Sequence, residues 1–512
     1  KFNQSIYRQA LDHFAKALEL CPDDKRQPLQ FYIAEAHFRL KNYKEAASEY
    51  ASTIALGPDT QLGQKSTYSL AWCHIRLGEP DKAIPHFEKQ AANKKSVVRA
   101  EAVKNLVDLL MNLHQYEKAI TTIEKWLDAV PAAERAELAY IRALSLSRTG
   151  EFEKSLVAFA DFVKKYPRHA RTNEAIYQTG LVNIALSRFK EAIDNFEKVS
   201  NEKVDPDLRE KAIYRIGECW FNLGNIKLAG DNFDKVIKVF PKGNARYDAL
   251  YQLGELAYMQ ESHADALTAF EAIAASKNEL AAQATFRSGE VLMKAGRHND
   301  AIIRFQEYLN RYPDGKLKED AIFKIGLAWL ELKDRAQALA AFSQLMNAKG
   351  YFRQEARFHI GEIARELENY PLAIQHYKAI IAEDAVHPLA SRARRAVGIS
   401  LYQTKDYKGA TETFAAILKD YPATDAAIPE SRLWFGKSLI ASGDIENGIL
   451  EILKVPVLYP GSEFIAPAYA EAARAYEKLN NINKSRMMYE ELLKVKPPVD
   501  LRQEAEAALK KN

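Results

Sequence analysis

The sequence predicts an all-α protein in which about fourteen helical hairpins stack into a superhelical solenoid with a C-terminal capping helix. Three observations predict this fold: a small residue that recurs at a regular interval, an aromatic residue four positions after it, and apolar residues at helical spacing on both sides of a turn. Two helices alone cannot bury an apolar face, so consecutive hairpins must stack on one another.

The recurring small residue lies inside a phrase similar to Lys/Glu-Ala-Ile-x-x-Phe. Its fourteen copies are separated by thirteen intervals of 35 to 38 residues, which average 36.5 because they cover 475 residues. An aromatic residue follows four positions later in twelve copies, whereas Ile123 and Ile452 stand there in the other two. Chance does not give fourteen copies in one register. The small residues are Ala10, Ala46, Ala83, Ala119, Ser155, Ala192, Ala229, Ala266, Ala301, Ala338, Ala373, Ala410, Gly448 and Ser485.

Each repeat predicts two antiparallel helices, as residues 211–222 and 226–240 illustrate. Both segments place apolar residues at the i, i+3, i+4, i+7 spacing of one helical face. Gly224 supplies the turn between them, because a helix C-terminus favours glycine. Gly217 and Ala229 lack bulky side chains, so the two backbones can approach closely. The position of Gly217 is glycine in eight consecutive repeats: Gly180, Gly217, Gly254, Gly289, Gly326, Gly361, Gly398 and Gly436.

The two ends of the chain predict an incomplete repeat and a cap. Residues 4–20 supply only the second helix of the first hairpin, so its first helix belongs to sequence before Lys1, or its apolar face meets a partner. At the other end, residues 500–511 are rich in Glu, Lys and Ala and predict a helix with a polar outer surface. The predicted domains are a repeat array over residues 1–498 and a capping helix over residues 499–512.

Composition limits the kinds of partner and compartment. The chain has 72 basic and 68 acidic residues, a formal charge of +4, so it lacks the basic field that dominates nucleic-acid binding. It has no run of about 18 apolar residues, so we expect no membrane-spanning segment. Three cysteines in 512 residues cannot make a disulfide framework, and they leave the redox compartment open.

The sequence gives no catalytic motif. Gly436-Lys437-Ser438 resembles the end of a phosphate-binding loop, but Ser431 stands where the first Gly is needed, and the segment lies inside a predicted helix. None of the eleven histidines forms a His-Glu-x-x-His motif or pairs with cysteine at metal-ligand spacing. We interpret the buried cysteines as small apolar residues. We expect no enzymatic activity, no metal site and no cofactor.

The repeat resembles the tetratricopeptide repeat over nearly the whole chain. The resemblance rests on the apolar-aromatic-x-Leu/Ile-Gly phrase of the first helix, the Ala-x-x-x-Phe phrase of the second helix and the closing Pro. Two features depart from the family. The period exceeds the family's length of about 34 residues, and residues such as Ile176, Leu250 and Thr285 replace the early Trp of the first helix.

These departures, together with repeat ends such as Tyr166-Pro167, are similar to the repeats of bacterial cell-envelope proteins. Examples are the Tol-Pal coordinator and the lipoprotein of the outer-membrane barrel-assembly machinery. The resemblance implies a non-enzymatic protein–protein interaction scaffold in a bacterial envelope assembly or coordination complex. It also implies a periplasmic or outer-membrane-associated location. A cytoplasmic tetratricopeptide-repeat scaffold or adaptor is the alternative.

In the tetratricopeptide family, the first helices line a concave groove, and their outward side chains determine which ligand binds. Between residues 211 and 366, the positions three before, one after and four after the recurring Gly carry aromatic, acidic and apolar residues. We therefore expect this groove to bind a peptide with apolar anchors and Lys or Arg. The candidate protein-binding residues are Tyr177, Tyr214, Glu218, Phe221, Tyr251, Glu255, Tyr258, Phe286, Glu290, Phe323, Phe358 and Glu362.

Several interpretations stay open. The aromatic residues either pack within the hairpins or form a ladder for the ligand, and the acidic residues either face solvent or meet the ligand. Arg392, Arg394 and Arg395 either bind a carboxylate or phosphate of a partner or pair with Glu362 and Glu366. An RNA-binding helical repeat is a further alternative, which needs a basic groove with polar code residues. The sequence does not specify the partner, the cellular process or the oligomeric state.

Overall fold

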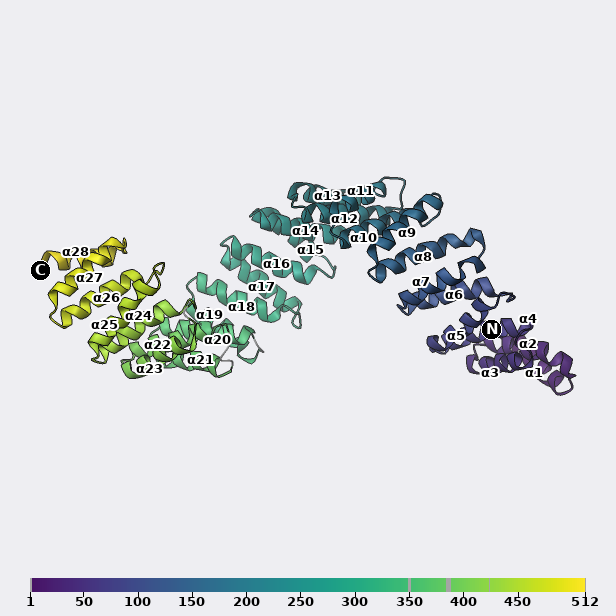
Figure 1. Cartoon of the computed structure of the whole chain (residues 1–512), viewed down its shortest axis with the longest axis horizontal. Coiled ribbons are helices and arrows are strands. Elements are labelled where there is room, and N and C mark those ends of the chain that lie inside the picture. The colour runs from purple at the N-terminus through teal and green to yellow at the C-terminus, as the bar shows by residue number, and fades with distance from the viewer. Residues whose placement is uncertain (1, 349–350, 384–387, 423, 512) are drawn as a thin grey trace. The chain divides into compact units, whose positions relative to one another are not determined.

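The structure is entirely helical in the part of the chain that it describes. It contains 28 α-helices and three short 3-10 helices there. The helices group into two units, residues 1–256 and 257–512, and the boundary falls inside α14 (Arg246–Met259). In each unit, helices that follow one another along the chain pack side by side (Figure 1). The computed structural model describes residues 2–348, 351–383, 388–422 and 424–511.

The first unit begins with a single helix and continues as hairpins. Two 3-10 turns, Leu127–Ala129 and Ala132–Glu134, connect α7 to α8. The helices of this unit are α1 (Phe2–Glu19), α2 (Asp23–Arg39), α3 (Tyr43–Leu56), α4 (Gln61–Arg76), α5 (Pro80–Ala92), α6 (Arg99–Asn112), α7 (Tyr116–Trp126), α8 (Arg135–Arg148), α9 (Phe152–Lys165), α10 (Thr172–Ala185), α11 (Phe189–Lys198), α12 (Pro206–Asn222), α13 (Ile226–Val239) and most of α14.

The second unit continues the same pattern and ends with a single helix. A 3-10 turn, Leu345–Asn347, follows α19. The helices that begin in this unit are α15 (His263–Ala274), α16 (Ala281–Lys294), α17 (His298–Arg311), α18 (Lys318–Glu331), α19 (Arg335–Gln344), α20 (Tyr351–Glu366), α21 (Tyr370–Glu383), α22 (Ala390–Gln403), α23 (Tyr407–Asp420), α24 (Ile428–Ala441), α25 (Ile445–Leu458), α26 (Ile465–Lys478), α27 (Ile482–Lys494) and α28 (Val499–Lys511).

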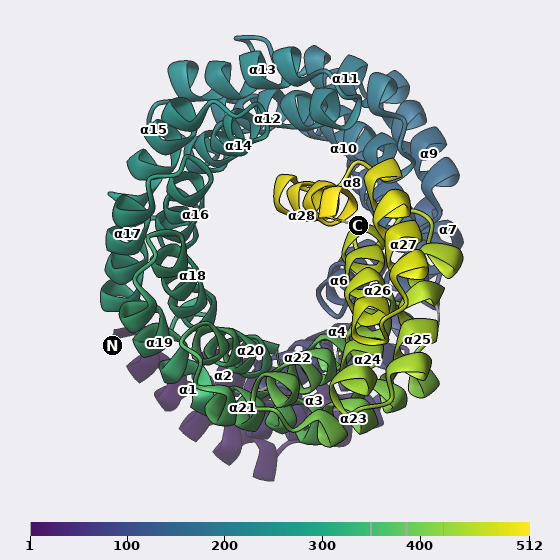
Figure 2. The ribbon, with the colours of Figure 1, turned by 90° about the vertical axis from the view of Figure 1, so that its left-hand side faces the viewer.

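Each hairpin contributes one helix to each of two layers. In the first unit, α8, α10 and α12 belong to the inner layer, and α7, α9, α11 and α13 belong to the outer layer (Figure 2). In the second unit, the even-numbered helices from α16 to α26 form the inner layer, and the odd-numbered helices from α15 to α27 form the outer layer (Figure 2). In these hairpins, the first helix is the one that belongs to the inner layer.

The two layers meet through the recurring glycine and aromatic residues. Gly217 of α12 faces Phe233 of α13, and a Cβ atom on Gly217 would lie 2.7 Å from the Phe233 ring. Phe233 is fully buried, and burying such a side chain contributes about 2 kcal/mol. In the second unit, a Cβ atom on Gly361 would lie 2.6 Å from the Tyr377 ring. Glycine at this position therefore leaves the space that the aromatic ring of the second helix fills.

Every complete hairpin in the described part of the chain turns on one residue in the left-handed backbone conformation. This residue is glycine in five hairpins, as at Gly224 with a φ of 76°. In the other eight hairpins it carries a side chain, as at Ser187 with a φ of 57°. The left-handed conformation costs such a residue about 1 kcal/mol, so the packing of the two helices holds these turns in place. The sequence predicts the turn at Gly224 but not the shared conformation of the others.

The structure confirms the predicted fold class, an all-α array of helical hairpins. The predicted helices 211–222 and 226–240 correspond to α12 and α13, and the predicted lone helix 4–20 corresponds to α1. At the other end, α28 packs against α26 and α27 and buries Ala505. The division into an array over residues 1–498 and a cap stays a prediction.

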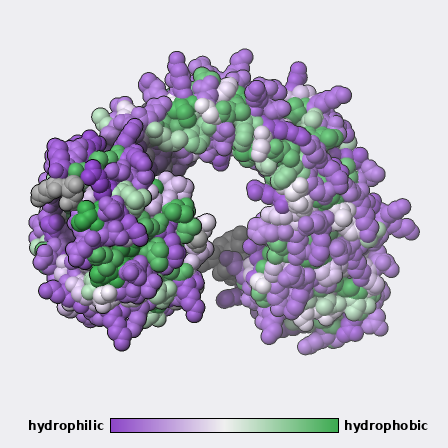
Figure 3. All heavy atoms as spheres, turned by 60° about the vertical axis from the view of Figure 1, so that its left-hand side comes forward, coloured by the Kyte–Doolittle hydropathy of each residue, from purple (hydrophilic) through white to green (hydrophobic). Residues whose placement is uncertain are grey.

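The face shown in Figure 3 is mainly hydrophilic, with scattered hydrophobic patches. Among the described residues, no helix combines the length and the apolar character that crossing a bilayer requires.

Candidate functional site

Four of the predicted binding residues are core side chains of their hairpins. Tyr177, Phe286, Phe323 and Phe358 are only 4 to 8% exposed. Each packs against the aromatic residue of the second helix in its own hairpin, with ring centroids 5.3 to 5.7 Å apart. Aromatic pairs of this kind contribute about 1 kcal/mol beyond burial alone. These buried rings join the two layers, and their part in a ligand ladder stays a prediction.

The predicted aromatic residues on α12 and α14 of the first unit are more accessible. Tyr214 is half-buried and packs against Phe233, with ring centroids 5.4 Å apart. Burial raises the pKa of the Tyr214 phenol to about 12. Tyr251 is half-buried and interacts with other side chains of the chain. Phe221, which is 38% exposed, is the most accessible of the predicted residues.

Tyr258 lies in the second unit and is held by two cations. The guanidinium of Arg287 is 4.7 Å from the centroid of its ring, and the ammonium of Lys294 is 4.9 Å from it. A cation over a tyrosine ring contributes about 0.5–1 kcal/mol at a partly exposed site. The ring is half-buried.

The predicted glutamates of α12 and α16 are paired with basic residues of the chain. Arg215 lies one turn before Glu218, and their charged groups are 2.5 Å apart. Glu290 has two partners, Arg287 on its own helix at 2.5 Å and Lys324 on α18 at 3.1 Å. The carboxylates thus form ion pairs within one inner helix and, at Glu290, between two neighbouring inner helices.

The remaining predicted glutamates also have partners. Glu362 accepts hydrogen bonds from Arg365, at 2.7 Å, and from the hydroxyl of Tyr377. Glu255 on α14 is half-buried and interacts within the chain. Basic residues therefore lie beside the carboxylates of Glu218, Glu290 and Glu362, and the binding role of the predicted glutamates stays a prediction.

The charges of the inner layer form a ladder whose sign reverses along the second unit. From α16 to α18, an acidic residue after the recurring Gly pairs with a basic residue of the next inner helix, as described for Glu290. From α24 to α26 the signs are exchanged, because Lys437 pairs with Glu471 at 3.0 Å. Arg474 of α26 then pairs with Glu504 of α28 at 2.5 Å. These pairs join residues that are 30 to 34 positions apart in the sequence, close to one repeat length.

The arginines of α22 are also used internally. Arg394 pairs with Asp420 at 3.1 Å, and Arg395 pairs with Glu430 at 2.9 Å. The guanidinium of Arg392 lies 4.5 Å from the centroid of the buried aromatic ring of α20. Internal pairing is therefore the correct interpretation of this cluster, although its ion-pair partners lie on α23 and α24 rather than on α20.

One pocket on the inner layer contains predicted binding residues. It has a volume of about 260 Å³ and is centred on α12, with the end of α10 and the start of α11 on one side and α14 on the other. We call it the inner pocket. It brings Glu218 and Phe221 together, whereas the other predicted residues lie outside it. The residues that line it are Ile184, Phe189, Arg215, Glu218, Cys219, Phe221, Asn222, Phe233 and Gln252.

The inner pocket combines apolar walls with a few polar groups. Ile184, Phe189 and Phe221 supply the apolar surface, and the Arg215–Glu218 pair supplies charged donors and acceptors. Such a composition is typical of sites that bind a side chain or a small molecule.

The two chemical motifs considered in the sequence have structural explanations. Burial raises the pKa of the Cys219 thiol to about 12, so it stays protonated and unreactive at neutral pH. Gly436-Lys437-Ser438 lies inside α24, where Lys437 forms the ion pair with Glu471. In the described residues, no three His, Cys, Asp or Glu side chains lie close enough to hold a metal ion together.

The sequence was compared with known families and proteins. Models described as tetratricopeptide repeat match residues 211–243, 251–316, 323–388 and 466–498. The first of these stretches contains α13 and most of α12, which carry the inner pocket. No curated protein matches the sequence.

Three solved structures are similar to the chain at low identity. The APC/C hetero-tetramer Cut9–Hcn1 is 12% identical over 97% of this chain and 98% of the other, with a TM-score of 0.34. A tetratricopeptide repeat protein from Parabacteroides merdae ATCC 43184 is 15% identical over 51% of this chain and 96% of the other, with a TM-score of 0.34. Naa15/Naa10 bound to HypK-THB is 11% identical over 95% of this chain and 66% of the other, with a TM-score of 0.37.

These likenesses are too low to carry an argument about function, so the family models are the informative comparison. All three of these models are described as tetratricopeptide repeat. The four matched stretches of this chain are tetratricopeptide repeats, within an all-α repeat array.

Proposed function

We propose that the chain is a non-enzymatic protein-interaction scaffold, and that its inner pocket takes an apolar side chain of a partner segment. The observation that carries this proposal is the exposed Phe221 beside a pocket with apolar walls. Aromatic residues next to a pocket are typical of the few positions that supply most of the affinity of a protein interface. The presence of tetratricopeptide repeats supports the proposal, because such repeats act as interaction scaffolds.

The partner segment lies along the inner layer, across α10, α12 and α14. The side chains of Arg215 and Gln252 offer hydrogen-bond donors to its backbone. A Lys or Arg of the partner, next to the apolar anchor, shares Glu218 with Arg215. Because Glu218 already has a cation beside it, the apolar anchor contributes more to affinity than this added charge.

We propose the bacterial cell envelope as the setting of this interaction. Support comes from the Tyr-Pro repeat ends and the long repeat period, which resemble the repeats of envelope proteins. A cytoplasmic adaptor with the same inner pocket is the competing setting, and the identity of the partner distinguishes the two.

Site-specific photo-crosslinking tests the function and the setting together. A benzophenone amino acid replaces Phe221 in the full chain, and the matched control carries it at Val239, an exposed apolar residue at the end of α13. After illumination in cells, mass spectrometry identifies the crosslinked segment. We expect an adduct from position 221 but not from position 239, on a segment with an apolar residue next to Lys or Arg.

Two results would overturn parts of the proposal. Equal crosslinking from both positions, or none from position 221, contradicts binding at the inner pocket. A specific adduct with a cytoplasmic protein supports the pocket but contradicts the envelope setting.

A further inference from the structure

A second pocket lies on the outer layer of the first unit, where the repeat is irregular. It has a volume of about 720 Å³ and lies between α7 and α9, against α8. Ile123 lines it and stands where twelve other repeats carry an aromatic ring. Helix α7 ends at Trp126 and has 11 residues, against 14 in α9. We call this space, which lies beside the irregular repeat, the outer pocket.

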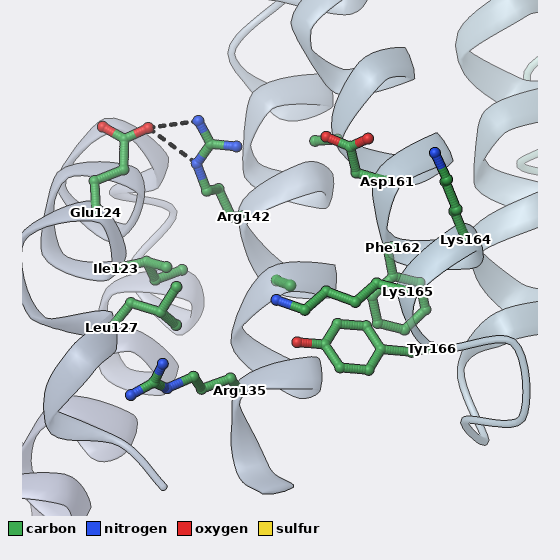
Figure 4. A pocket seen from close by; sticks show the side chains of 12 residues that line it. Ile123, Glu124, Leu127, Arg135, Arg142, Asp161, Phe162, Lys164, Lys165 and Tyr166 are labelled. Carbon is green, nitrogen blue, oxygen red and sulfur yellow. Dashed lines mark hydrogen bonds and ion pairs between the residues drawn. The ribbon is translucent and has the colours of Figure 1, made fainter. Parts of the chain in front are cut away.

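The floor of the outer pocket is apolar. Leu127 follows α7, and Phe162 lies on α9 (Figure 4). Ala139 lies on α8, and Ala158 lies on α9. Phe162 is fully buried, whereas the two alanines and Leu127 are half-buried. The alanines contribute little bulk, so the pocket has room for an apolar side chain from outside.

The two arginines of the pocket are held by neighbouring groups. Nε and Nη2 of Arg142 donate to one oxygen of Glu124 at 2.9 and 2.6 Å (Figure 4). Nε of Arg135 donates to the backbone carbonyl of Val130 at 2.8 Å. These contacts fix the guanidinium groups at the edge of the pocket on the side of α7 and α8.

The two lysines at the end of α9 are different. Lys164 and Lys165 are exposed, and within the described residues no carboxylate lies at ion-pair distance from either. Lys165 and Tyr166 extend from α9 into the pocket toward Leu127, and the Lys165 ammonium is 5.5 Å from the Tyr166 ring centroid (Figure 4). Four basic and two acidic side chains line the pocket, which gives it a net charge of +2.

Helix stability alone explains only part of this arrangement. Lys164 and Lys165 stand in the last turn of α9, where a positive charge interacts with the helix dipole and contributes about 0.5 kcal/mol. That effect depends on the position of the charge along the helix. It does not require the Lys165 side chain to reach over an apolar floor.

We propose that the outer pocket binds an acidic segment of a partner protein. One apolar or aromatic side chain of that segment enters between α7 and α9 and contacts the half-buried residues of the floor, Leu127, Ala139 and Ala158. Flanking Asp or Glu residues pair with Lys164 and Lys165. The positive charge of the rim and the apolar floor together select this occupant, because a basic segment is repelled and a purely polar one leaves the floor unfilled. This proposal does not depend on the inner pocket.

Selection from a displayed random-peptide library tests the proposal with the full chain. Peptides that bind the unaltered chain are sequenced, and their affinities are measured by fluorescence anisotropy. One variant combines Lys164→Glu with Lys165→Glu, and a second, Ala158→Trp, fills the floor. The matched control combines Lys227→Glu with Lys235→Glu, which reverses two exposed lysines of α13 in the same unit. Circular dichroism confirms that each variant keeps its helix content.

We expect a class of selected peptides that carry an apolar residue flanked by Asp or Glu. Their affinity falls about tenfold or more when the two lysines are reversed, because attraction is replaced by repulsion. Ala158→Trp and a higher salt concentration each lower the affinity of these peptides as well. The α13 control leaves their affinity unchanged.

Either of two results overturns the proposal. One is that the lysine and Ala158 substitutions change the affinity of no selected peptide, or that the peptides whose affinity they change are basic or uncharged. The other is that a labelled mixed-sequence oligonucleotide, and no acidic peptide, shows this dependence, since the pocket then binds nucleic acid instead of protein.

Discussion

The inner pocket at α12 and the outer pocket between α7 and α9 lie in the same unit but are built from different kinds of repeat. At the inner pocket the repeat is regular: Gly217 admits the Phe233 ring, and Glu218 is paired with Arg215. At the outer pocket, Ile123 replaces the aromatic ring. The rim carries Lys164 and Lys165 in addition to the two arginines that are held by neighbouring groups of the chain. The charged residues that line the inner pocket are thus paired with each other, whereas Lys164 and Lys165 at the outer pocket, which belong to the next hairpin, α8–α9, have no ion-pair partner among the described residues.

The largest effect that we expect concerns the regular repeat. Gly217→Ala places a methyl group 2.7 Å from the Phe233 ring, so the hairpin must shift, and we expect a loss of about 2 kcal/mol in the free energy of unfolding. Gly230→Ala in α13 is the matched control. Its Cβ atom would meet only leucine methyls at 3.9 Å, and we expect a gain of about 0.5–1 kcal/mol there. Urea unfolding measures both, and equal effects would contradict the close approach at Gly217.

The hairpin turns beside the two pockets are expected to respond in opposite directions. Gly150, before α9, and Ser187, before α11, both adopt the left-handed conformation, with φ of 81° and 57°. Gly150→Ala is expected to lose about 1 kcal/mol of stability, and Ser187→Gly to gain up to about 1 kcal/mol. Thermal unfolding checks both. A destabilising Ser187→Gly would show that its side chain, rather than the helix packing, maintains the turn.

A smaller effect on stability is expected to distinguish a charge that is paired within the chain from one that is not. Arg215→Ala leaves the half-buried Glu218 without its cation, and we expect a loss of about 0.5–1 kcal/mol in the free energy of unfolding. Lys165→Ala removes a side chain with no ion pair, so we expect less than about 0.5 kcal/mol from the lost dipole and ring contacts. Equilibrium unfolding in low salt compares the two. If Lys165→Ala costs as much as Arg215→Ala, the contrast between the pockets fails.

The hairpins and their core follow from the sequence because they depend on local spacing. Gly217 and Phe233 recur at fixed positions, and helical periodicity places them on facing sides of one hairpin. The inner surface is harder to predict because side-chain direction decides it. Phe286 recurs in the same register as half-buried Tyr214, yet it is buried, and Glu290 meets Lys324 only after the next inner helix has packed beside it.

The outer pocket is harder to predict from the sequence than the hairpins are. Ile123 is visible as an exception to the aromatic pattern, but Ile452 is an exception of the same kind. The space also depends on where α7 ends and on the direction in which Lys165 extends. Neither follows from residue spacing, because the end of a helix and the direction of a side chain depend on how the neighbouring helices pack.

The most direct test of the account is a competition between two labelled peptides on the full chain. One reproduces the segment that crosslinks to position 221, and the other is the tightest acidic peptide that depends on Lys164 and Lys165. Fluorescence anisotropy follows each peptide while the other is added. We predict that both bind at once, that Phe221→Asp removes only the first, and that the paired lysine reversal removes only the second. Mutual displacement, or loss of both peptides in one variant, would contradict two separate binding surfaces.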